Sequence, residues 1–157
     1  MRRYEFASAL VATALISGGA FADPASDVEA VKAADLAFYT ALSAMDAKAM
    51  AAVWADKPYV TNISPVSKAV AVGNADAVTK FMATVIAGRY SELRAQKTSI
   101  ASVQVNGNVA WVVGTAHVNG KSKAGDAVSF DVFVTDIFEK DDGKWLMVAK
   151  HAQALPQ

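Results

Sequence analysis

The sequence has 157 residues, of which 54% are hydrophobic, and it contains no Cys. This length fits one ordinary domain with a sizeable core. Lys and Arg together number 15, as do Asp and Glu, so the formal net charge is zero. The balanced charge and the lack of a basic stripe argue against nucleic acid as a partner. The absence of Cys excludes disulfide bonds and thiolate chemistry.

The first 22 residues have the pattern of a secretory signal peptide. Arg2 and Arg3 provide a positive start, and the apolar stretch 7–22 ends in Ala-Phe-Ala, an A-x-A cleavage signal. The stretch is shorter than the roughly 20 residues of a membrane span. We therefore predict cleavage before Asp23, a folded domain over 23–157, and a periplasmic or secreted protein that leaves the membrane after cleavage. The alternative is an uncleaved N-terminal anchor.

The folded part is predicted to begin with a long helix. Ser26 and Glu29 have the spacing of a capping box, which marks a helix start. Apolar residues then recur at three- and four-residue spacing to about residue 44, which gives the helix one apolar face. These residues are Val31, Ala34, Phe38, Leu42 and Met45.

A second helix and a hairpin are predicted to follow. Asp46 is placed to cap a short helix over 47–55, which Pro58 ends. The hydrophobic period then changes from 3.6 to 2 residues, which predicts strands at 59–63 and 68–72.

The second half of the chain is predicted to contain one more helix and a meander of strands. The helix covers 74–88, with Asn74 as its cap and Gly88 at its end. Short turn sequences rich in Asn, Asp and Gly, one of them Asn119-Gly120, separate the apolar segments that follow, as in antiparallel hairpins. The predicted strands are 98–105, 109–118, 127–139 and 145–154.

Three helices followed by long antiparallel strands predict an α+β fold, with the helices packed on one face of a curved sheet. The long strands are apolar on both faces, and a large exposed apolar face is costly. We therefore predict a homodimer through the outer sheet face. The alternative is a monomer whose outer face is merely uncharged.

Four short motifs follow one another in an order and spacing that resemble a known family. They are Ala44-Met45-Asp46 with Met50 and Val53-Trp54-Ala55, then Asn62-Ile63-Ser64-Pro65 followed by Gly73, then Thr135-Asp136 with Gly143-Lys144-Trp145, and finally Lys150-His151-Ala152-Gln153. Together they resemble the SnoaL-like and ketosteroid isomerase-like branch of the nuclear transport factor 2-like superfamily. The resemblance spans nearly all of residues 23–157.

The resemblance implies a cone-shaped, cystatin-like fold, in which the sheet wraps the helices around an apolar pocket. Such pockets serve isomerases, dehydratases, cyclases and hydrolases, and also proteins that only bind a ligand, so the fold does not give the function. Two positions depart from the family pattern. Asn74 stands where an aromatic residue often follows the glycine, and Gln153 replaces the final Ser.

The candidate catalytic residues are Asp131 and His151. Strict alternation along the last strand puts Lys150 on the face opposite His151, which favours His151 on the concave face. Asp is depleted in strands, so Asp131 and Asp136 both stand out, and their opposite parity means that only one of them faces the pocket. An inward Asp131 opposite His151 would form an acid–base pair. The alternatives are a structural His151 and an Asp131 that forms a surface ion pair.

His117 is the other candidate histidine, either at the pocket rim or at the surface. Two histidines without Cys and without metal-ligand spacing predict no metal, and the sequence contains no cofactor-binding motif. The aromatic residues are mostly core candidates, but some are expected to line the pocket. The predicted pocket residues beside His117 are Tyr39, Trp54, Tyr59, Trp111, Phe133 and Gln153.

The leading hypothesis is therefore a pocket that binds a small apolar or cyclic molecule. Acid–base catalysis without a cofactor, of the isomerase, dehydratase or hydrolase type, is one use of such a pocket. A ligand-binding or dimerisation module without catalysis is the alternative.

Overall fold

The computed structural model describes residues 24–156, which form one layer of helices on one curved sheet. The predicted α+β class, with three helical regions packed on a mainly antiparallel sheet, is confirmed. The helices are α1 (Pro24–Ser43), α2 (Ala47–Val53), η1 (Ala75–Ile86) and α3 (Ala87–Arg89). The strands are β1 (Thr61–Ile63), β2 (Ala71–Val72), β3 (Tyr90–Asn106), β4 (Val109–Ser122), β5 (Ala127–Asp141) and β6 (Lys144–Ala154).

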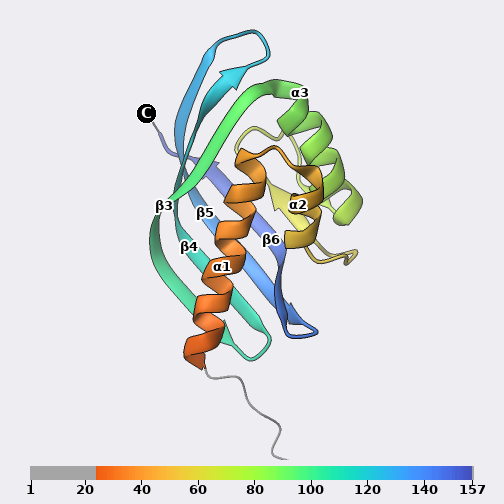
Figure 1. Ribbon diagram of the computed structural model, residues 1–157, viewed down its shortest axis with the longest axis vertical. Helices are drawn as coiled ribbons and strands as arrows, with labels where there is room; N and C mark the ends of the chain where they lie inside the picture. Colours follow the sequence, from red (N-terminus) through yellow and green to blue (C-terminus); the bar gives the residue numbers. More distant parts are fainter. Residues whose placement is uncertain (1–23, 157) are drawn as a thin grey trace, which may run out of the picture.

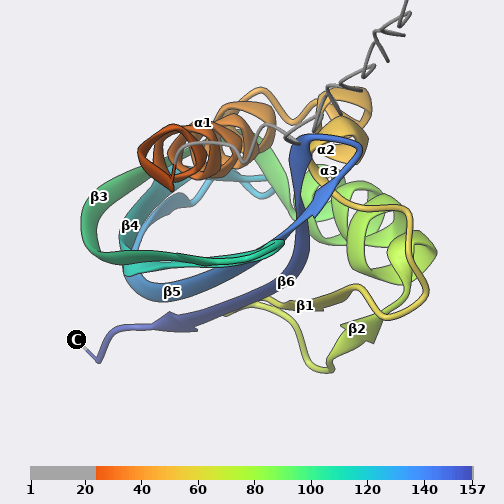
Figure 2. The same ribbon diagram turned by 90° about the horizontal axis from the view of Figure 1, so that it is seen from below.

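The six strands are ordered β2-β1-β6-β5-β4-β3, and all neighbours are antiparallel except β1 and β6. The sheet curves around α1, which lies along its concave side (Figures 1 and 2). The helix η1 packs on α2 and on the β1–β2 end of the sheet. The hydrophobic core fills the space between α1 and the inward side chains of the long strands. No helix within residues 24–156 has the length and apolar content that a membrane span needs.

The starts of the helices agree with the sequence patterns only in part. Asp46 caps α2 as predicted, because its Oδ1 accepts hydrogen bonds from the amides of Lys48 and Ala49 at 2.9 and 3.0 Å. Ser26, in contrast, already lies inside α1, so it does not precede the helix as a capping box requires. Asn74 makes no capping bond; its Nδ2 donates to the Ala55 carbonyl oxygen and ties the end of α2 to η1.

The predicted third helix is present, but η1 is a π-helix of 12 residues, the type in which amides bond to carbonyls five residues back. Periodicity analysis cannot separate this from an α-helix over so short a segment, because both give an apolar stripe.

The turn predicted at Asn119-Gly120 is wrong, because β4 continues to Ser122. Gly120 is needed for a different reason. A Cβ at this position would overlap the carbonyl oxygen of Glu92 on β3, so only glycine lets the two backbones approach.

A β-bulge in β6 decides which residues face the helices. Ile137 of β5 pairs with Ala149, whereas the next residue, Phe138, pairs with Met147, so Val148 has no partner across the ladder. The extra residue reverses the alternation along β6. Met147 and Lys150 both point inward as a result, although they differ in parity.

Candidate functional site

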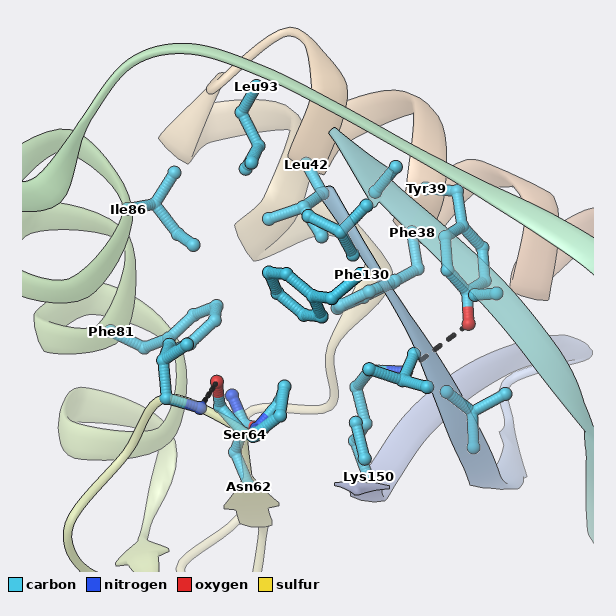
Figure 3. A pocket seen from close by; sticks show the side chains of 18 of the residues that line it. Phe38, Tyr39, Leu42, Asn62, Ser64, Phe81, Ile86, Leu93, Phe130 and Lys150 are labelled. Atoms are coloured by element: carbon cyan, nitrogen blue, oxygen red, sulfur yellow. Dashed lines mark hydrogen bonds between the residues drawn. The ribbon is translucent and has the colours of Figure 1, made fainter. Parts of the chain in front are cut away.

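A cavity of about 60 Å³ lies inside the cone, between α1, η1 and the concave face of the sheet. Its walls are almost entirely apolar, and Phe38, Leu42, Phe81 and Phe130 form much of them (Figure 3). Asn62 of β1 and Lys150 of β6 are paired in the sheet, and both line the cavity. The Lys150 side chain extends from there toward Tyr39 on α1. The Ser64 hydroxyl accepts a hydrogen bond from the amide of Val66, at 3.4 Å.

Tyr39 and Lys150 form the polar end of the cavity. The Lys150 ammonium lies 3.4 Å from the Tyr39 hydroxyl oxygen and 2.6 Å from Oδ1 of Asp136, behind the cavity wall. The Tyr39 hydroxyl also donates to Oδ2 of Asp136, at 3.4 Å. The Lys150 nitrogen lies 4.4 Å from the ring centre of Phe38, where a cation is attracted to the ring face.

Behind this end, Asp35, Lys97, Asp136 and Lys150 form what we call the buried charge cluster. The Lys97 ammonium lies 3.1 Å from Oδ2 of Asp35 and 2.9 Å from Oδ2 of Asp136. The two aspartates are 2% and 0% exposed, and the Lys97 and Lys150 side chains are 9% and 8% exposed. The ionised cluster is neutral, since two carboxylates face two ammonium groups.

The two carboxyl groups differ in acidity. Burial, together with the negative charge of Asp136, raises the pKa of Asp35 from 3.8 to about 7. Burial also acts to raise the pKa of Asp136, but the charges of Lys150 and Lys97 outweigh it and hold that pKa below 3.8. Near neutral pH, Asp136 is therefore ionised, whereas Asp35 gains and loses a proton.

Tyr39 stays protonated across the ordinary pH range. Burial and the neighbouring carboxylates of Asp136 and Asp35 raise the pKa of its hydroxyl far above 10. The hydroxyl therefore acts as a hydrogen-bond donor at the cavity wall. One oxygen, Oδ1 of Asp35, is buried without a hydrogen-bond partner among the described residues, as is Oδ1 of Asn62.

The sequence matches the family model for the SnoaL-like domain over residues 31–154, which is most of its length. The chain belongs to the SnoaL-like family. No curated protein is significantly similar to the sequence.

Solved structures share the SnoaL-like fold with this chain at low sequence identity. A dehydratase candidate of the nuclear transport factor 2-like family from Streptomyces avermitilis has a TM-score of 0.74 and 23% identity, covering 86% of this chain and 100% of its own. A cystatin-like protein from Caulobacter vibrioides has a TM-score of 0.69 and 15% identity, covering 83% and 91%. The hexachlorocyclohexane dehydrochlorinase LinA-type3 from Novosphingobium barchaimii has a TM-score of 0.72 and 13% identity, covering 84% and 88%. These likenesses show the fold alone.

In this SnoaL-like domain, Asp131 and His151 lie on the outer face of the sheet, away from the cavity. Both are exposed, and Asp131 bonds instead to Nδ1 of His117, at 2.8 Å. His151 pairs with Thr135, four residues along β5 from Asp131. The inward orientation expected for His151 is wrong because the bulge at Val148 reverses the alternation of β6. The predicted catalytic pair lacks the contact on which it depended, and Asp136 is the aspartate that faces inward.

The predicted pocket residues lie in four different places. Tyr39 lines the cavity, whereas Trp54 is buried in the core beside Phe38, with ring centres 6.3 Å apart. Tyr59 is exposed and donates its hydroxyl to Glu139, at 2.6 Å. The remaining four, which alternate with the buried residues of their strands, lie on the outer sheet face: Trp111, His117, Phe133 and Gln153.

Sequence reasoning missed Asp35, Lys97 and Lys150 as site residues. Asp35 gave a detectable signal, because it lies four residues after Val31 and four before Tyr39, within the apolar stripe of α1. A carboxylate in such a stripe is rarely buried without a cation. Lys97 was missed because the strand was predicted to begin at residue 98, whereas β3 begins eight residues earlier and includes Lys97. Within residues 24–156, no group of three or more His, Cys, Asp and Glu side chains is arranged to hold a metal ion.

The raised pKa of Asp35 predicts a pH dependence of stability. The folded state holds the Asp35 proton up to about pH 7, whereas the unfolded chain releases it near 3.8. Folding stability contributed by this group is therefore complete below about pH 4 and is lost as the pH rises through 7. Asp35→Asn should flatten the decline in the free energy of unfolding between pH 5 and 8, as measured by urea denaturation.

The exposed Asp76→Asn is the matched control, and its pH profile over the same range should follow that of the wild type. Parallel profiles for Asp35→Asn and the wild type would show that Asp35 does not titrate near neutral pH.

Proposed function

We propose that this SnoaL-like domain binds one small, largely apolar molecule in its cavity and holds an oxygen atom of that molecule against Tyr39 and Lys150. The observation that carries the proposal is the polar end of an otherwise apolar cavity. There, a hydroxyl and an ammonium, both donors, lie 3.4 Å apart. Pockets of this kind use apolar walls for affinity and a few polar groups for orientation. A carbonyl or hydroxyl oxygen can accept an N–H of Lys150 and, when the Tyr39 hydroxyl turns away from Asp136, the one O–H of Tyr39.

The size of the cavity limits the ligand. At about 10–15 Å³ for each water molecule, 60 Å³ holds a few waters or a short apolar group. A single ring requires that the half-buried side chains of Phe81 and Phe130 give way, and several fused rings do not fit this conformation. We therefore place the ligand among molecules of one ring or a short chain.

Acid–base catalysis without a cofactor is the second candidate function. It is favoured by Asp35, whose pKa is raised to about 7 and which shares the Lys97 ammonium with Asp136. Asp136 bonds to both Tyr39 and Lys150, so the titrating carboxyl group next to Asp136 lies close behind the cavity wall. A ligand oxygen that gains negative charge in an isomerisation or dehydration would accept hydrogen bonds from Tyr39 and Lys150. The dehydratase candidate and the dehydrochlorinase of similar fold support this class of chemistry. The alternative is binding without catalysis.

Replacing Tyr39 tests the proposed polar end. Cyclohexanone and methylenecyclohexane have the same shape, but only cyclohexanone offers an oxygen. Tyr39→Phe removes one neutral donor, worth about 0.5–1.5 kcal/mol, and should lower the preference for cyclohexanone by about 2- to 10-fold. Ligand-detected NMR titration measures both affinities.

Tyr90→Phe is the matched control, because Tyr90 lines the same cavity away from the charge cluster. It should leave the preference unchanged. An equal loss in both variants, or no preference in the wild type, would contradict the proposed role of Tyr39.

We also propose that two copies associate through the outer sheet face. Phe133 is 55% exposed on this face, where it pairs with Thr115 of β4 and Gln153 of β6. The half-buried Val113 and Trp111 lie farther along the same face. Burying a large exposed aromatic side chain stabilises association. Phe133→Glu should therefore convert the dimer to a monomer in sedimentation velocity, whereas Leu36→Glu, at an exposed position of α1, should not. A wild-type protein that sediments as a monomer would rule out this interface.

Export is proposed from the sequence alone, since residues 1–22 lie outside the described part of the structure. The positive start, the apolar stretch and the Ala20-Phe21-Ala22 signal support cleavage before Asp23. Mass spectrometry of the protein recovered from the periplasm or medium should show a chain that begins at Asp23. Recovery of the intact chain from the cytoplasm alone would contradict export.

A further inference from the structure

A groove on the surface lies directly outside the cavity. It runs between η1 and the segment that joins β1 to β2, and it encloses about 350 Å³. Two residues, Val66 and Phe81, line both the groove and the cavity. The two spaces are therefore separated at this point by only two side chains.

Phe81 is the larger part of this partition. It is half-buried and extends from η1 into the cavity, on the side opposite Lys150 (Figure 3). Its helix is of the π type, which is rare and is found frequently at functional sites. Val66 lies in a tight turn, in which the Ser67 amide donates to the Ser64 carbonyl oxygen at 3.0 Å. The turn holds the backbone of Val66, and Phe81 contributes the larger side chain to the partition.

The groove carries positive charge. Its lining includes three cationic side chains, Lys68, Lys80 and Arg89, and one anionic side chain, Asp76. Lys80 lies 3.7 Å from Asp76, which leaves Lys68 and Arg89 uncompensated within the groove. An excess of positive charge at the mouth of an apolar cavity attracts anions and raises their local concentration.

We propose that Phe81 is the gate of the cavity and that the groove selects small amphiphilic carboxylates. The apolar part of the ligand passes Phe81 into the cavity together with the oxygen that meets Tyr39 and Lys150. A carboxylate at the other end of the ligand stays outside, beside Lys68 and Arg89. This inference rests on the proposed binding function, which it deepens by naming the ligand class and the route. It also accounts for the small cavity, because the charged end of the ligand needs no room inside.

The gate is tested with cyclohexanecarboxylate as the probe and NMR exchange spectroscopy as the measurement. Phe81→Ala joins the two spaces and should raise the association rate by about tenfold, within the range that single substitutions produce. Phe81→Trp places a larger side chain in the passage and should lower the association rate. Leu146→Ala is the control, since Leu146 is half-buried but lines neither space. Equal rates in Phe81→Trp and the wild type would overturn the gate even if Phe81→Ala fails to fold.

The charge selection is tested by comparing cyclohexanecarboxylate with the neutral cyclohexanecarboxamide. Lys68→Gln and Arg89→Gln should each weaken carboxylate binding by up to about fivefold and leave amide binding unchanged. Added salt should weaken carboxylate binding in the wild type more than in the double variant. The exposed Lys48→Gln, on α2, is the control.

The outcomes separate the two proposals. A carboxylate preference that survives in the double variant would place the anion elsewhere and overturn the selection by the groove, while leaving cavity binding intact. If no probe binds to the wild type or to Phe81→Ala, and methylenecyclohexane does not bind either, then the proposed function fails and the gate fails with it.

Discussion

The structure depends on one carboxylate, that of Asp136, which lies in the middle of the sheet with none of its surface exposed. An unpaired charge at such a place costs several kcal/mol or more. Lys97 from β3 and Lys150 from β6 neutralise it, and Tyr39 from α1 contributes a hydrogen bond. Three elements, α1, β3 and β6, are thereby joined to one side chain of β5. The sheet must curve for this to happen, because β3 and β6 lie on opposite sides of β5 and yet both lysines reach the same carboxylate.

Buried ion pairs are a weak source of stability, since well-packed apolar side chains of similar volume often do as well. The buried charge cluster is therefore better explained by its position than by its contribution to folding. It lies behind the polar end of the cavity, and Lys150 belongs both to the cluster and to the cavity wall. The bulge at Val148 is what brings Lys150 there. The bulge in β6 thus determines whether the Lys150 ammonium or the His151 imidazole faces the cavity.

The overall fold could be predicted from the sequence because its signals are regular: the apolar stripe of α1, the cap at Asp46 and the turn residues between long strands. The site could not be predicted, because it depends on features that interrupt this regularity. Alternation along β6 places His151 inward only if the strand has no bulge, and nothing in Met147-Val148-Ala149 indicates one. The sequence also does not show which face of the sheet packs against the helices, since both faces of β4 and β5 are apolar. Tyr39 and Asp136 were singled out from the sequence, and Asp35 was detectable as a carboxylate within an apolar helix face.

The protonation of Asp35 links the two candidate uses of the cavity. A cluster with only a structural role would be expected to satisfy each buried polar atom, but Oδ1 of Asp35 has no partner among the described residues. Its pKa near 7 means that the cluster changes from neutral to a charge of plus one as the pH falls through neutrality. The added charge lies one residue behind Tyr39 and Lys150, so it would strengthen the proposed hold of these residues on a ligand oxygen that carries negative charge. The same proton that would serve acid–base chemistry would therefore also control binding, and both follow from placing a second carboxyl group beside Asp136.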